Sequence, residues 1–477
     1  MANNFVGRKR ELEQLNLLLQ KQTASLVVVT GRRRIGKSRL IQEFGGSHQV
    51  YTFSGLPPTP QTTMKEQLRE FGWQLGKALG EPAFKDDDWN DLFLRLANRT
   101  RTRRVIIFLD EISWMGSKDP QFLGKLKNAW DLEFKKNTQL ILVLCGSVSS
   151  WIEKNILSST GFVGRVSLTL KLGELPLVDC NSFWGRQSQK ISAYEKLKIL
   201  AVTGGIPKYL EEIQPSLSAE ENIKNLCFSP GGFLFNEFDH IFTDIFAKRS
   251  EMYTRILEAI IKGHHEINRI CDALKIEKSG AFSGYLDDLI QSGFLKRDFT
   301  WSPASQKASK LSHYRVSDNY VNFYLKYIVP LKEKIERGHF DQQSLLSLPG
   351  WEAIMGLQFE NLVLSNRAAI FPLLNLRPDD IIYDNPFFQN KTVRQEACQI
   401  DYLIQTRMDS VYACEVKFSK HPIGVKIIGE MEEKLKRLRL PRYTSRRPVL
   451  IHVNGVSDEL LESQYFSQII DFSQLLL

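Results

Sequence analysis

The chain has 477 residues, which corresponds to about three domains at ~150 residues each. Its apolar share of 43% and aromatic share of 11% allow several hydrophobic cores and exclude a disordered chain. A formal net charge of +9 favours a polyanionic partner such as a nucleotide, a nucleic acid or a membrane surface.

Hydropathy and the placement of the cysteines restrict the cellular compartment in which we expect the protein. No run of ~18 apolar residues is present, which argues against a membrane span, and residues 1–5 lack the basic-then-apolar order of a signal peptide. The six cysteines are scattered, with no Cys-x-x-Cys pair and no paired histidine nearby, which argues against structural zinc and against a disulfide scaffold. We therefore expect a cytoplasmic protein that does not engage a membrane.

The first predicted functional element is a glycine-rich loop. The β-branched run 26–29 predicts a buried parallel strand, and residues 39–44 have helical spacing. Between them the sequence has the form G-x-x-x-x-G-K-S, the pattern of a phosphate-binding loop in the required strand–helix context. The candidate nucleotide-binding residues are Gly31, Arg32, Arg33, Arg34, Ile35, Gly36, Lys37, Ser38 and Arg39.

Each residue type in this loop suits a phosphate ligand. Gly31 and Gly36 let backbone N–H groups converge on phosphate oxygens, and the following helix directs its positive dipole end at the same anion. Lys37 would reach the β- and γ-phosphates, and the Ser38 hydroxyl would bind Mg²⁺. The alternative is a glycine-rich turn with incidental basic residues, which the flanking strand and helix disfavour.

Two further strands supply polar residues at their ends. The strand 105–109 is followed by Asp110 and Glu111: Asp110 would hold the Mg²⁺ shell, and Glu111 would act as the general base on the attacking water. Alone, this acidic pair is also consistent with a cap for the following turn. The strand 140–146 precedes Ser147, where a γ-phosphate sensor and an ordinary turn residue are equally consistent with the pattern.

Together these motifs resemble the archaeal/bacterial ATPase family, which belongs to the AAA+-related STAND class of P-loop NTPases. The resemblance covers about the first 240 residues and implies ATP as the nucleotide and a sensor role for Ser147. It also implies that Arg165 senses phosphate, in cis or across the interface of a homo-oligomer; a surface salt bridge is the alternative for Arg165. The segments that carry the resemblance are 5–11, expected at the adenine side, 105–111, 164–165, and 204–207, expected to open a helical lid.

The middle of the chain predicts a winged helix-turn-helix. Its expected elements are helices at 253–262, ended by Gly263, at 267–274 and at 279–290, then strands at 293–297 and 314–316. The third helix carries Asp287 and Asp288, which DNA phosphates would repel. Nonspecific backbone contact and a purely packing role stay open, because the hairpin region carries the cations Lys296, Arg297, Lys307, Lys310 and Arg315.

The last third carries acids on predicted strands. Asp401 lies in the alternating segment 399–404, and Glu415 and Lys417 project from one face of the strand 411–417. Two acids around one or two divalent ions, with a lysine beside them, form a phosphodiester-cleaving arrangement. Of the three Glu-x-Lys triplets in the chain, only the one at Glu415 combines a strand context with an upstream aspartate.

This arrangement resembles the PD-(D/E)xK nuclease superfamily, and specifically the C-terminal module that follows the ATPase and winged helix in the same family. The resemblance implies that Glu360 is a helix acid, that Asp401 and Glu415 are metal ligands and that Lys417 is the catalytic lysine. Ile400 departs from the proline that precedes the aspartate in the pattern. A basic run follows, which would track a phosphate backbone or serve as a solvated surface: Lys434, Lys436, Arg437, Arg439, Arg442, Arg446 and Arg447.

We therefore expect an α/β protein with a P-loop NTPase core of the ASCE/AAA+ type and a C-terminal restriction-endonuclease-like α/β domain. The predicted domains are the ATPase core at 1–185, a helical lid at 186–245, the winged helix at 246–330 and the nuclease-like domain at 331–477. The expected function is ATP hydrolysis, with Mg²⁺, that controls a nuclease or nucleic-acid-binding module, with DNA favoured over RNA. The alternative is a signalling or scaffold switch whose C-terminal domain is catalytically silent; a sequence-specific repressor is disfavoured by the acidic third helix.

Overall fold

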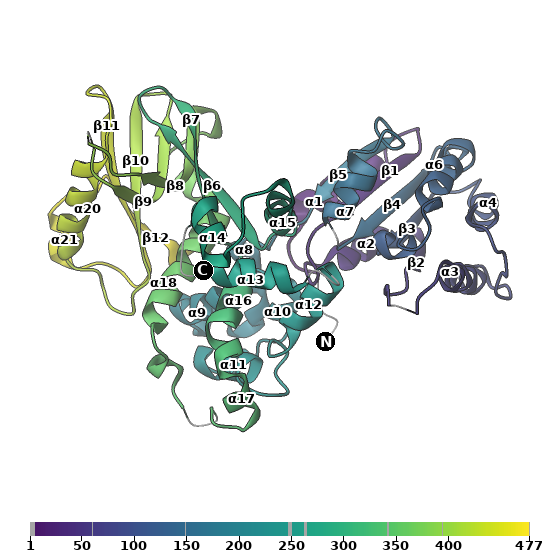
Figure 1. Cartoon of the computed structure of the whole chain (residues 1–477), viewed down its shortest axis with the longest axis horizontal. Helices are drawn as coiled ribbons and strands as arrows, with labels where there is room; N and C mark the ends of the chain where they lie inside the picture. The colour runs from purple at the N-terminus through teal and green to yellow at the C-terminus, as the bar shows by residue number, and fades with distance from the viewer. Residues whose placement is uncertain are drawn as a thin grey trace. The chain divides into compact units, whose positions relative to one another are not determined.

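The structure is a computed structural model that describes residues 5–59, 61–147, 149–246, 250–261, 265–340, 343–393 and 395–476, with the backbone alone at 243–246. The chain divides into two compact units, Met1–Gly173 with Gln291–Gly293, and Glu174–Ile290 with Phe294–Leu477 (Figure 1). The helical segment predicted as a lid therefore packs with the C-terminal two thirds of the chain rather than with the ATPase core.

The first unit is built on a five-stranded parallel sheet in the order β2-β3-β4-β1-β5. Both faces of the central strands are buried, which explains their continuous apolar runs. The strands are β1 (Ser25–Thr30), β2 (Gln49–Ser54), β3 (Val105–Asp110), β4 (Leu140–Gly146) and β5 (Val166–Lys171).

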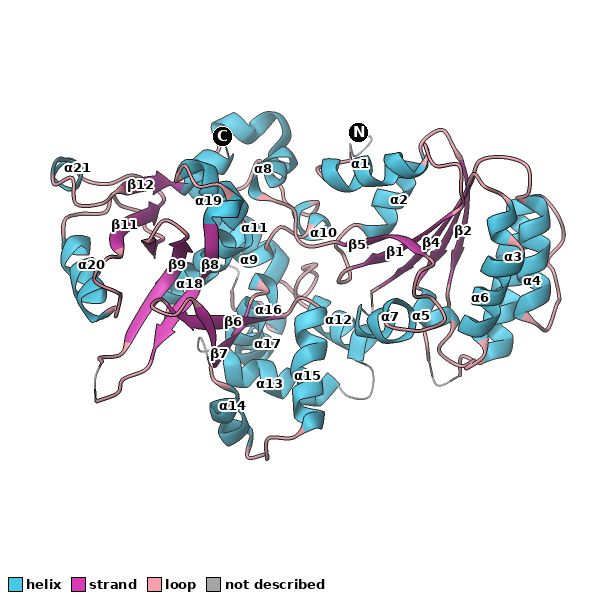
Figure 2. Ribbon diagram, turned by 90° about the horizontal axis from the view of Figure 1, so that it is seen from above, coloured by secondary structure: helices cyan, strands magenta, loops and turns pink. Residues whose placement is uncertain are grey.

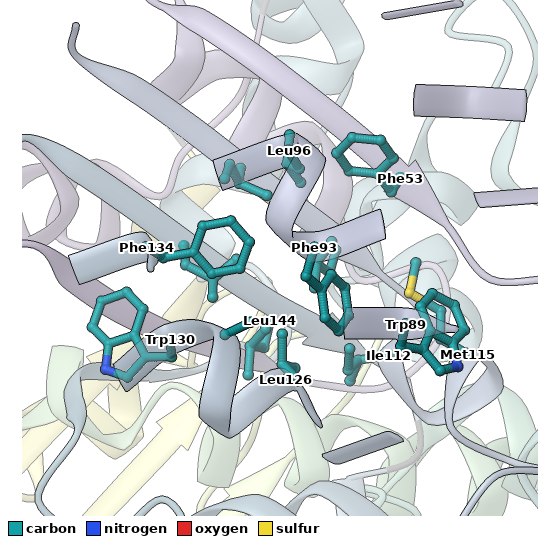
Figure 3. Close-up of a cluster of buried hydrophobic side chains, with 14 of the residues drawn as sticks. Phe53, Trp89, Phe93, Leu96, Ile112, Met115, Leu126, Trp130, Phe134 and Leu144 are labelled. Atoms are coloured by element: carbon teal, nitrogen blue, oxygen red, sulfur yellow. The ribbon is translucent and has the colours of Figure 1, made fainter. Parts of the chain in front are cut away.

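Helices cover both faces of this sheet. In Figure 2, α1 (Lys9–Leu18) and α2 (Lys37–Gly45) lie on one side, and α3 (Met64–Leu79), α4 (Trp89–Arg99) and α6 (Phe122–Leu132) lie on the other. Alternate strand residues pack against the second set and form an aromatic-rich core (Figure 3). In that core Trp89 stacks on Phe93 with 5.5 Å between ring centroids. The unit also contains the short helices α5 (Ile112–Met115) and α7 (Ser149–Ile152).

The second unit begins with helices that are fixed to its own C-terminal end. The Leu177 N–H donates to Asn366 Oδ1 at 3.0 Å, and the buried Lys196 ammonium donates to the Leu476 carbonyl at 3.2 Å. These contacts join residues almost 200 and 280 positions apart and make the helices part of this unit. The helices are α8 (Leu177–Cys180), α9 (Ala193–Thr203), α10 (Pro207–Leu210), α11 (Ala219–Cys227) and α12 (Glu237–Phe246).

Three helices and an antiparallel hairpin then follow in the predicted order. They are α13 (Ser250–Ile260), α14 (Ile267–Leu274), α15 (Gly280–Gln291), β6 (Leu295–Ser302) and β7 (Lys307–Val316). The predicted helix end at Lys262 and Gly263 lies outside the described residues. Both strands of the hairpin extend further than the sequence pattern indicated.

The hairpin packs against the C-terminal sheet. The Trp301 indole N–H donates to Gln405 Oε1 at 2.5 Å, and its ring stacks on Tyr383. The Thr300 hydroxyl donates to the Phe388 carbonyl at 3.0 Å. Arg315, one of the cations considered for phosphate contact, is buried in an ion pair with Asp298 and also bonds Asn361. Arg315 therefore has a packing role, and its guanidinium is not available to a phosphate backbone.

The C-terminal sheet has the order β12-β11-β10-β9-β8. Strands β8, β9 and β10 pair antiparallel, and β10, β11 and β12 pair parallel, with α20 as the crossover between β10 and β11. The elements are α16 (Asn319–Phe323), α17 (Val329–Glu336), α18 (Trp351–Ser365), α19 (Arg367–Leu373), β8 (Ile381–Gln389), β9 (Cys398–Thr406), β10 (Ser410–Lys417), α20 (Lys426–Arg437), β11 (Ser445–His452), α21 (Asp458–Glu462) and β12 (Gln468–Asp471). Within the described residues, no helix has the length and apolar character needed to span a bilayer.

Candidate functional site

The glycine-rich loop connects the end of β1 to the start of α2, as the sequence pattern predicts. Gly31 and Gly36 have φ values of 148° and 88°, in the region that favours glycine. A Cβ at position 31 would lie 2.6 Å from the Leu172 carbonyl oxygen, so no larger residue fits there without a shift of the backbone. Both glycines are therefore required by the backbone path of the loop.

Lys37 lies inside this loop. Its side chain is buried, and its ammonium donates to the carbonyls of Gly31 at 2.9 Å and Arg32 at 3.0 Å. The loop thus wraps around the ammonium of the lysine predicted to contact the β- and γ-phosphates. A phosphate that displaced these carbonyls would meet a positive charge in a largely water-excluded position, where it acts more strongly than in bulk water.

Ser38 and Asp110 meet beside the lysine. The Ser38 hydroxyl donates to Asp110 Oδ2 at 2.6 Å, although the two residues are 72 positions apart in sequence. A hydroxyl and a carboxylate are the hard oxygen ligands that Mg²⁺ takes when it also binds substrate phosphates. The residues present at this point therefore fit a magnesium ion.

Glu111 occupies a constrained position at the end of β3. Its φ of 49° is uncommon for a residue other than glycine, and such backbone conformations cluster at functional sites. The Glu111 carboxylate accepts hydrogen bonds from the Ser147 N–H at 3.1 Å and hydroxyl at 2.9 Å. The predicted general base and the predicted sensor are thus held together by adjacent strands, which places Ser147 at the site.

Arg8 is a site residue that the sequence reasoning did not single out. It is buried, and its guanidinium donates to the carbonyls of Ile35 at 3.2 Å and Gly173 at 2.5 Å. Arg8 therefore anchors the predicted adenine-side segment 5–11 against the loop. The sequence signal available was the Gly7-Arg8 pair directly before a helical segment, and in the structure both residues have positive φ values, 70° and 57°.

The structure contradicts the cis role considered for Arg165. Arg165 directly precedes β5, and Leu26 near the start of β1 pairs with Val166. The loop follows the opposite, carboxyl end of these parallel strands, roughly 20 Å away at ~3.3 Å per residue. Arg165 instead forms a bidentate ion pair with Asp131, at 3.0 and 2.9 Å, which lowers the pKa of that carboxyl. A role across a subunit interface stays a prediction.

The second candidate site lies on the C-terminal sheet. Tyr402 pairs with Cys414 in the β9–β10 register, so the next pair along places Asp401 opposite Glu415. Asp401 Oδ2 accepts from the Val416 N–H at 3.0 Å. The Lys434 ammonium bridges the two acids, at 2.5 Å from Glu415 Oε2 and 3.4 Å from Asp401 Oδ1.

Lys417 joins the same network. Its ammonium lies 3.0 Å from Glu415 Oε1 and 3.1 Å from Glu430 Oε2, and these carboxylates raise its pKa against the opposing effect of burial. Burial, followed by the charge of Glu415, raises the pKa of Asp401. Two acids therefore share a poorly solvated position that requires a cation, and Lys434 provides one.

Glu360 is nearby on α18 but does not complete a metal cluster. Burial and the charge of Asp401 raise the pKa of Glu360 to about 8. Among the described residues, however, no three His, Cys, Asp or Glu side chains gather closely enough to hold a metal ion. The predicted three-acid set is thus reduced to the Asp401–Glu415 pair. The two carboxylates already face one ammonium group. As metal ligands they therefore fit a single divalent cation.

Lys434 was assigned from the sequence only to a basic run. The helical spacing indicates that Lys434 faces the sheet. Ile427, Met431 and Lys434 follow the i, i+4, i+7 spacing of one helix face, and the first two are buried. The other members of the run are exposed on the end of α20 and the following segment, as expected for either a solvated surface or a phosphate-binding one.

Comparison with known proteins finds a family match in the N-terminal part of the chain. Residues 5–213 match the family described as an ATPase domain predominantly from Archaea. The uncharacterised protein MJECL04 of Methanocaldococcus jannaschii is 26% identical over 360 residues, 75% of each chain. From the same organism, the uncharacterised ATP-binding protein MJ0423 is 48% identical over 40 residues, which are 8% of this chain and 68% of that protein.

Two solved structures are similar at low sequence identity. The Walker-type ATPase PABY2304 of Pyrococcus abyssi has 17% identity and a TM-score of 0.47, covering 68% of this chain and 97% of that one. The ORC2 protein of Aeropyrum pernix has 14% identity and a TM-score of 0.41, covering 71% and 97%. The family match over residues 5–213, the parallel sheet and the loop that encloses Lys37 together support a P-loop ATPase domain of archaeal type in this part of the chain.

Proposed function

We propose that this protein uses ATP binding and hydrolysis to control a nucleic-acid-cleaving site on its C-terminal sheet. The observation that supports the ATPase half most directly is the contact of Ser38 with Asp110 at 2.6 Å beside the enclosed ammonium of Lys37. These three side chains come from two separate strand ends. Their meeting supports a site for a ligand that carries phosphates and a magnesium ion.

Each residue of the ATPase site has a distinct task in the proposal. Lys37 neutralises the β- and γ-phosphates, while Ser38 and Asp110 hold the magnesium ion. Glu111 accepts a proton from the attacking water, and Ser147 orients its carboxylate through the two hydrogen bonds described above. The magnesium ion, when bound, supplies positive charge that stabilises the transferred phosphoryl group.

The C-terminal half of the proposal rests on the Asp401–Glu415 pair. Both carboxylates would hold one divalent cation, which when bound polarises a phosphodiester and its attacking water. Lys417 extends from the edge of the pair toward Glu430, where its ammonium would contact the non-bridging phosphate oxygens. The helix–hairpin segment 250–316 would then support this domain, since its hairpin packs on the C-terminal sheet through Trp301.

A second candidate function is favoured by Lys434. Because this lysine already neutralises both acids, the pair also fits a fold retained without catalysis. In that case the protein would be an ATP-dependent switch that changes its self-association or its partner. The ATPase assignment is common to both candidates.

One experiment separates the two candidates. Plasmid DNA and single-stranded DNA are incubated with Mg²⁺ or Mn²⁺, with and without ATP, using the wild type and Asp401→Ala. We expect the wild type to nick or degrade DNA and Asp401→Ala to lose this activity, since half of the cation-binding pair is removed. Absence of cutting under every condition, together with an ATP-dependent change in oligomer size, would establish the switch instead.

A further inference from the structure

We propose that a groove beside the acidic pair binds single-stranded nucleic acid; this inference rests on the proposed function of the C-terminal domain. The groove has a volume of about 910 Å³ and lies within the second unit. Its walls come from α14, β7, α18, and the ends of β8 and β9. We call it the α18 groove. Its volume is at the upper end of the range of ligand pockets.

The polar lining of the α18 groove suits a phosphate-linked ligand. Arg269 and Lys326 line it from two different elements and are exposed, and two carboxylates, Glu266 and Glu360, line it as well. Asn390 and Gln399 add exposed amides, which offer both donors and acceptors. Cations for phosphates and amides for base edges are the side chains that nucleic-acid sites combine.

His313 contributes an aromatic ring to the wall of the groove. It lines the groove with its ring 4.1 Å from that of Phe388, yet both ring nitrogens are buried without a hydrogen-bond partner. The nearest acid, Glu266, lies 3.7 Å from His313 Nε2, beyond hydrogen-bond distance. Burial lowers the pKa of His313, so the neutral ring offers one donor and one acceptor. Because both nitrogens are enclosed, a base in the groove would contact the face or edge of the ring and not its nitrogens.

A basic pocket adjoins the groove across the segment between β8 and β9. It has a volume of about 870 Å³, and we call it the α20 pocket. Gln389 lines the α18 groove, and its amide donates to the carbonyls of Glu396 at 2.7 Å and Arg437 at 2.8 Å, which line the α20 pocket. The two cavities therefore share a wall. The four cations of the α20 pocket, Lys436, Arg437, Arg439 and Arg446, outnumber its two acids, Glu396 and Glu433, of which Glu433 is paired with Arg437.

The acidic pair lies next to this path. Glu360 lines the α18 groove, and the charges of Asp401 and Glu415 act on its carboxyl. Cys398, another lining residue, donates to the main-chain carbonyl of Lys434, whose ammonium bridges the same two acids. A strand that continues from the groove to the basic pocket would thus carry a phosphodiester past the acids.

A single strand fits these features better than a duplex. Unpaired bases expose their edges and faces to amides and rings, whereas a duplex encloses them. The hairpin β6–β7, which a winged helix would place on a duplex, is instead occupied by packing, because Trp301 and Thr300 are bonded to the C-terminal sheet. The DNA or RNA identity of the strand is an outcome of the test.

The test measures binding by fluorescence anisotropy with the full-length protein in EDTA, which prevents metal-dependent cleavage. The probes are a labelled single-stranded DNA of about twelve nucleotides, the RNA of the same sequence and the corresponding DNA duplex. We expect Arg269→Ala combined with Lys326→Ala to weaken single-strand binding about tenfold or more at moderate salt, because two phosphate contacts are removed. Thermal melts confirm that each variant is folded.

The matched control is Lys334→Ala combined with Arg337→Ala, which removes two exposed cations that line neither cavity. This control should change affinity less than twofold. Equal losses in both double variants, tighter binding of the duplex, or no binding of a single strand by the wild type would each overturn the groove assignment. The DNA-cleavage assay with Asp401→Ala is independent of these outcomes, so failure of the proposed function is recognised separately.

Discussion

At the scale of single residues, Glu111 combines an unusual backbone conformation with a fixed side chain. Its carboxylate accepts two hydrogen bonds from Ser147, at 3.1 and 2.9 Å, which orient it. This environment suits a group that removes a proton from water and returns it to solvent. In the proposed mechanism the metal ion is held instead by Asp110, which accepts a hydrogen bond from Ser38.

The first prediction concerns Glu111→Gln. Glutamine keeps the size of the side chain and one oxygen to accept from Ser147, but it is not a base. We expect ATP binding close to that of the wild type and a steady-state ATPase rate reduced about 10²- to 10³-fold, the usual contribution of a general base. Nucleotide binding by calorimetry and phosphate release measure the two quantities. A turnover rate equal to that of the wild type would remove Glu111 from the mechanism.

The second prediction concerns Lys434, which serves as the counter-ion of Asp401 and Glu415. Lys434→Met keeps the length of the side chain but leaves two acids in a poorly solvated place. Since Lys434 is 29% exposed, we expect a modest loss of about 1–3 kcal/mol in the free energy of unfolding. Added Mn²⁺ should restore the stability by taking the place of the ammonium.

Thermal melts with and without Mn²⁺ measure this effect. The control is Lys436→Met, which removes an exposed lysine on the same helix and should respond little to the metal. If Mn²⁺ shifts the melting temperature of Lys434→Met no more than that of the control, the Asp401–Glu415 pair does not bind a divalent cation. This readout requires no catalytic activity, so it also applies if the site is silent.

At the scale of elements, the sequence predicted those features whose residues lie next to one another in the chain. The loop from Gly31 to Ser38, and the strand that ends at Asp110, were readable because the residues that define them are adjacent in sequence. The places of Arg165 and Lys434 in the folded protein could not be predicted from their sequence neighbours. Arg165 depends on which end of a strand faces the loop, and Lys434 depends on which face of α20 packs on the sheet; both are set by tertiary packing.

The role of the hairpin β6–β7 also depended on packing between elements. Its cations suggested a phosphate contact, but Arg315 is buried with Asp298, and Trp301 is inserted beside Tyr383 and bonded to Gln405. The sequence of a hairpin does not reveal whether its strands are covered by another sheet. In this chain a tryptophan in the middle of a predicted polar loop was the signal that one side is buried.

The third prediction tests this packing with Trp301→Ala. Trp301 is 3% exposed, and its loss leaves a cavity and an unpaired Gln405 amide oxygen. We expect a loss of about 3–5 kcal/mol in the free energy of unfolding of the second unit. Denaturant titration followed by circular dichroism measures it, with Phe299→Ala as the control, since Phe299 is on the same strand but 44% exposed. Similar losses in both variants would contradict a packing role for the hairpin.

At the scale of the whole molecule, one connection between the two units follows β5 and begins beside the nucleotide loop. The Leu172 N–H donates to the Thr30 carbonyl at 2.8 Å, and the Leu172 carbonyl lies against Gly31. The chain leaves the first unit directly afterwards, at Gly173, and enters the second at Glu174. The loop and this connection are therefore in direct contact through Leu172.

The second unit is suited to respond to a change in the loop as one body. The helices that follow Glu174 are bonded to its distant C-terminal part through Leu177 with Asn366 and through Lys196 with the Leu476 carbonyl. Movement of the first helices would thus move the C-terminal sheet with its acidic pair. Switching proteins use a few residues at element ends as hinges in this way.

The fourth prediction is that ATP changes the arrangement of the two units and that Lys37→Ala abolishes the change. In the wild type we expect small-angle X-ray scattering curves with Mg²⁺ and a non-hydrolysable ATP analogue to differ from those with ADP. Lys37→Ala loses the ammonium that the loop encloses, so its curves should not depend on the nucleotide. Lys21→Ala, an exposed lysine ahead of β1, is the control and should behave as the wild type. If the wild-type curves coincide in both nucleotide states while calorimetry shows that both nucleotides bind, ATP does not act through this connection, and control of the C-terminal site would need another route.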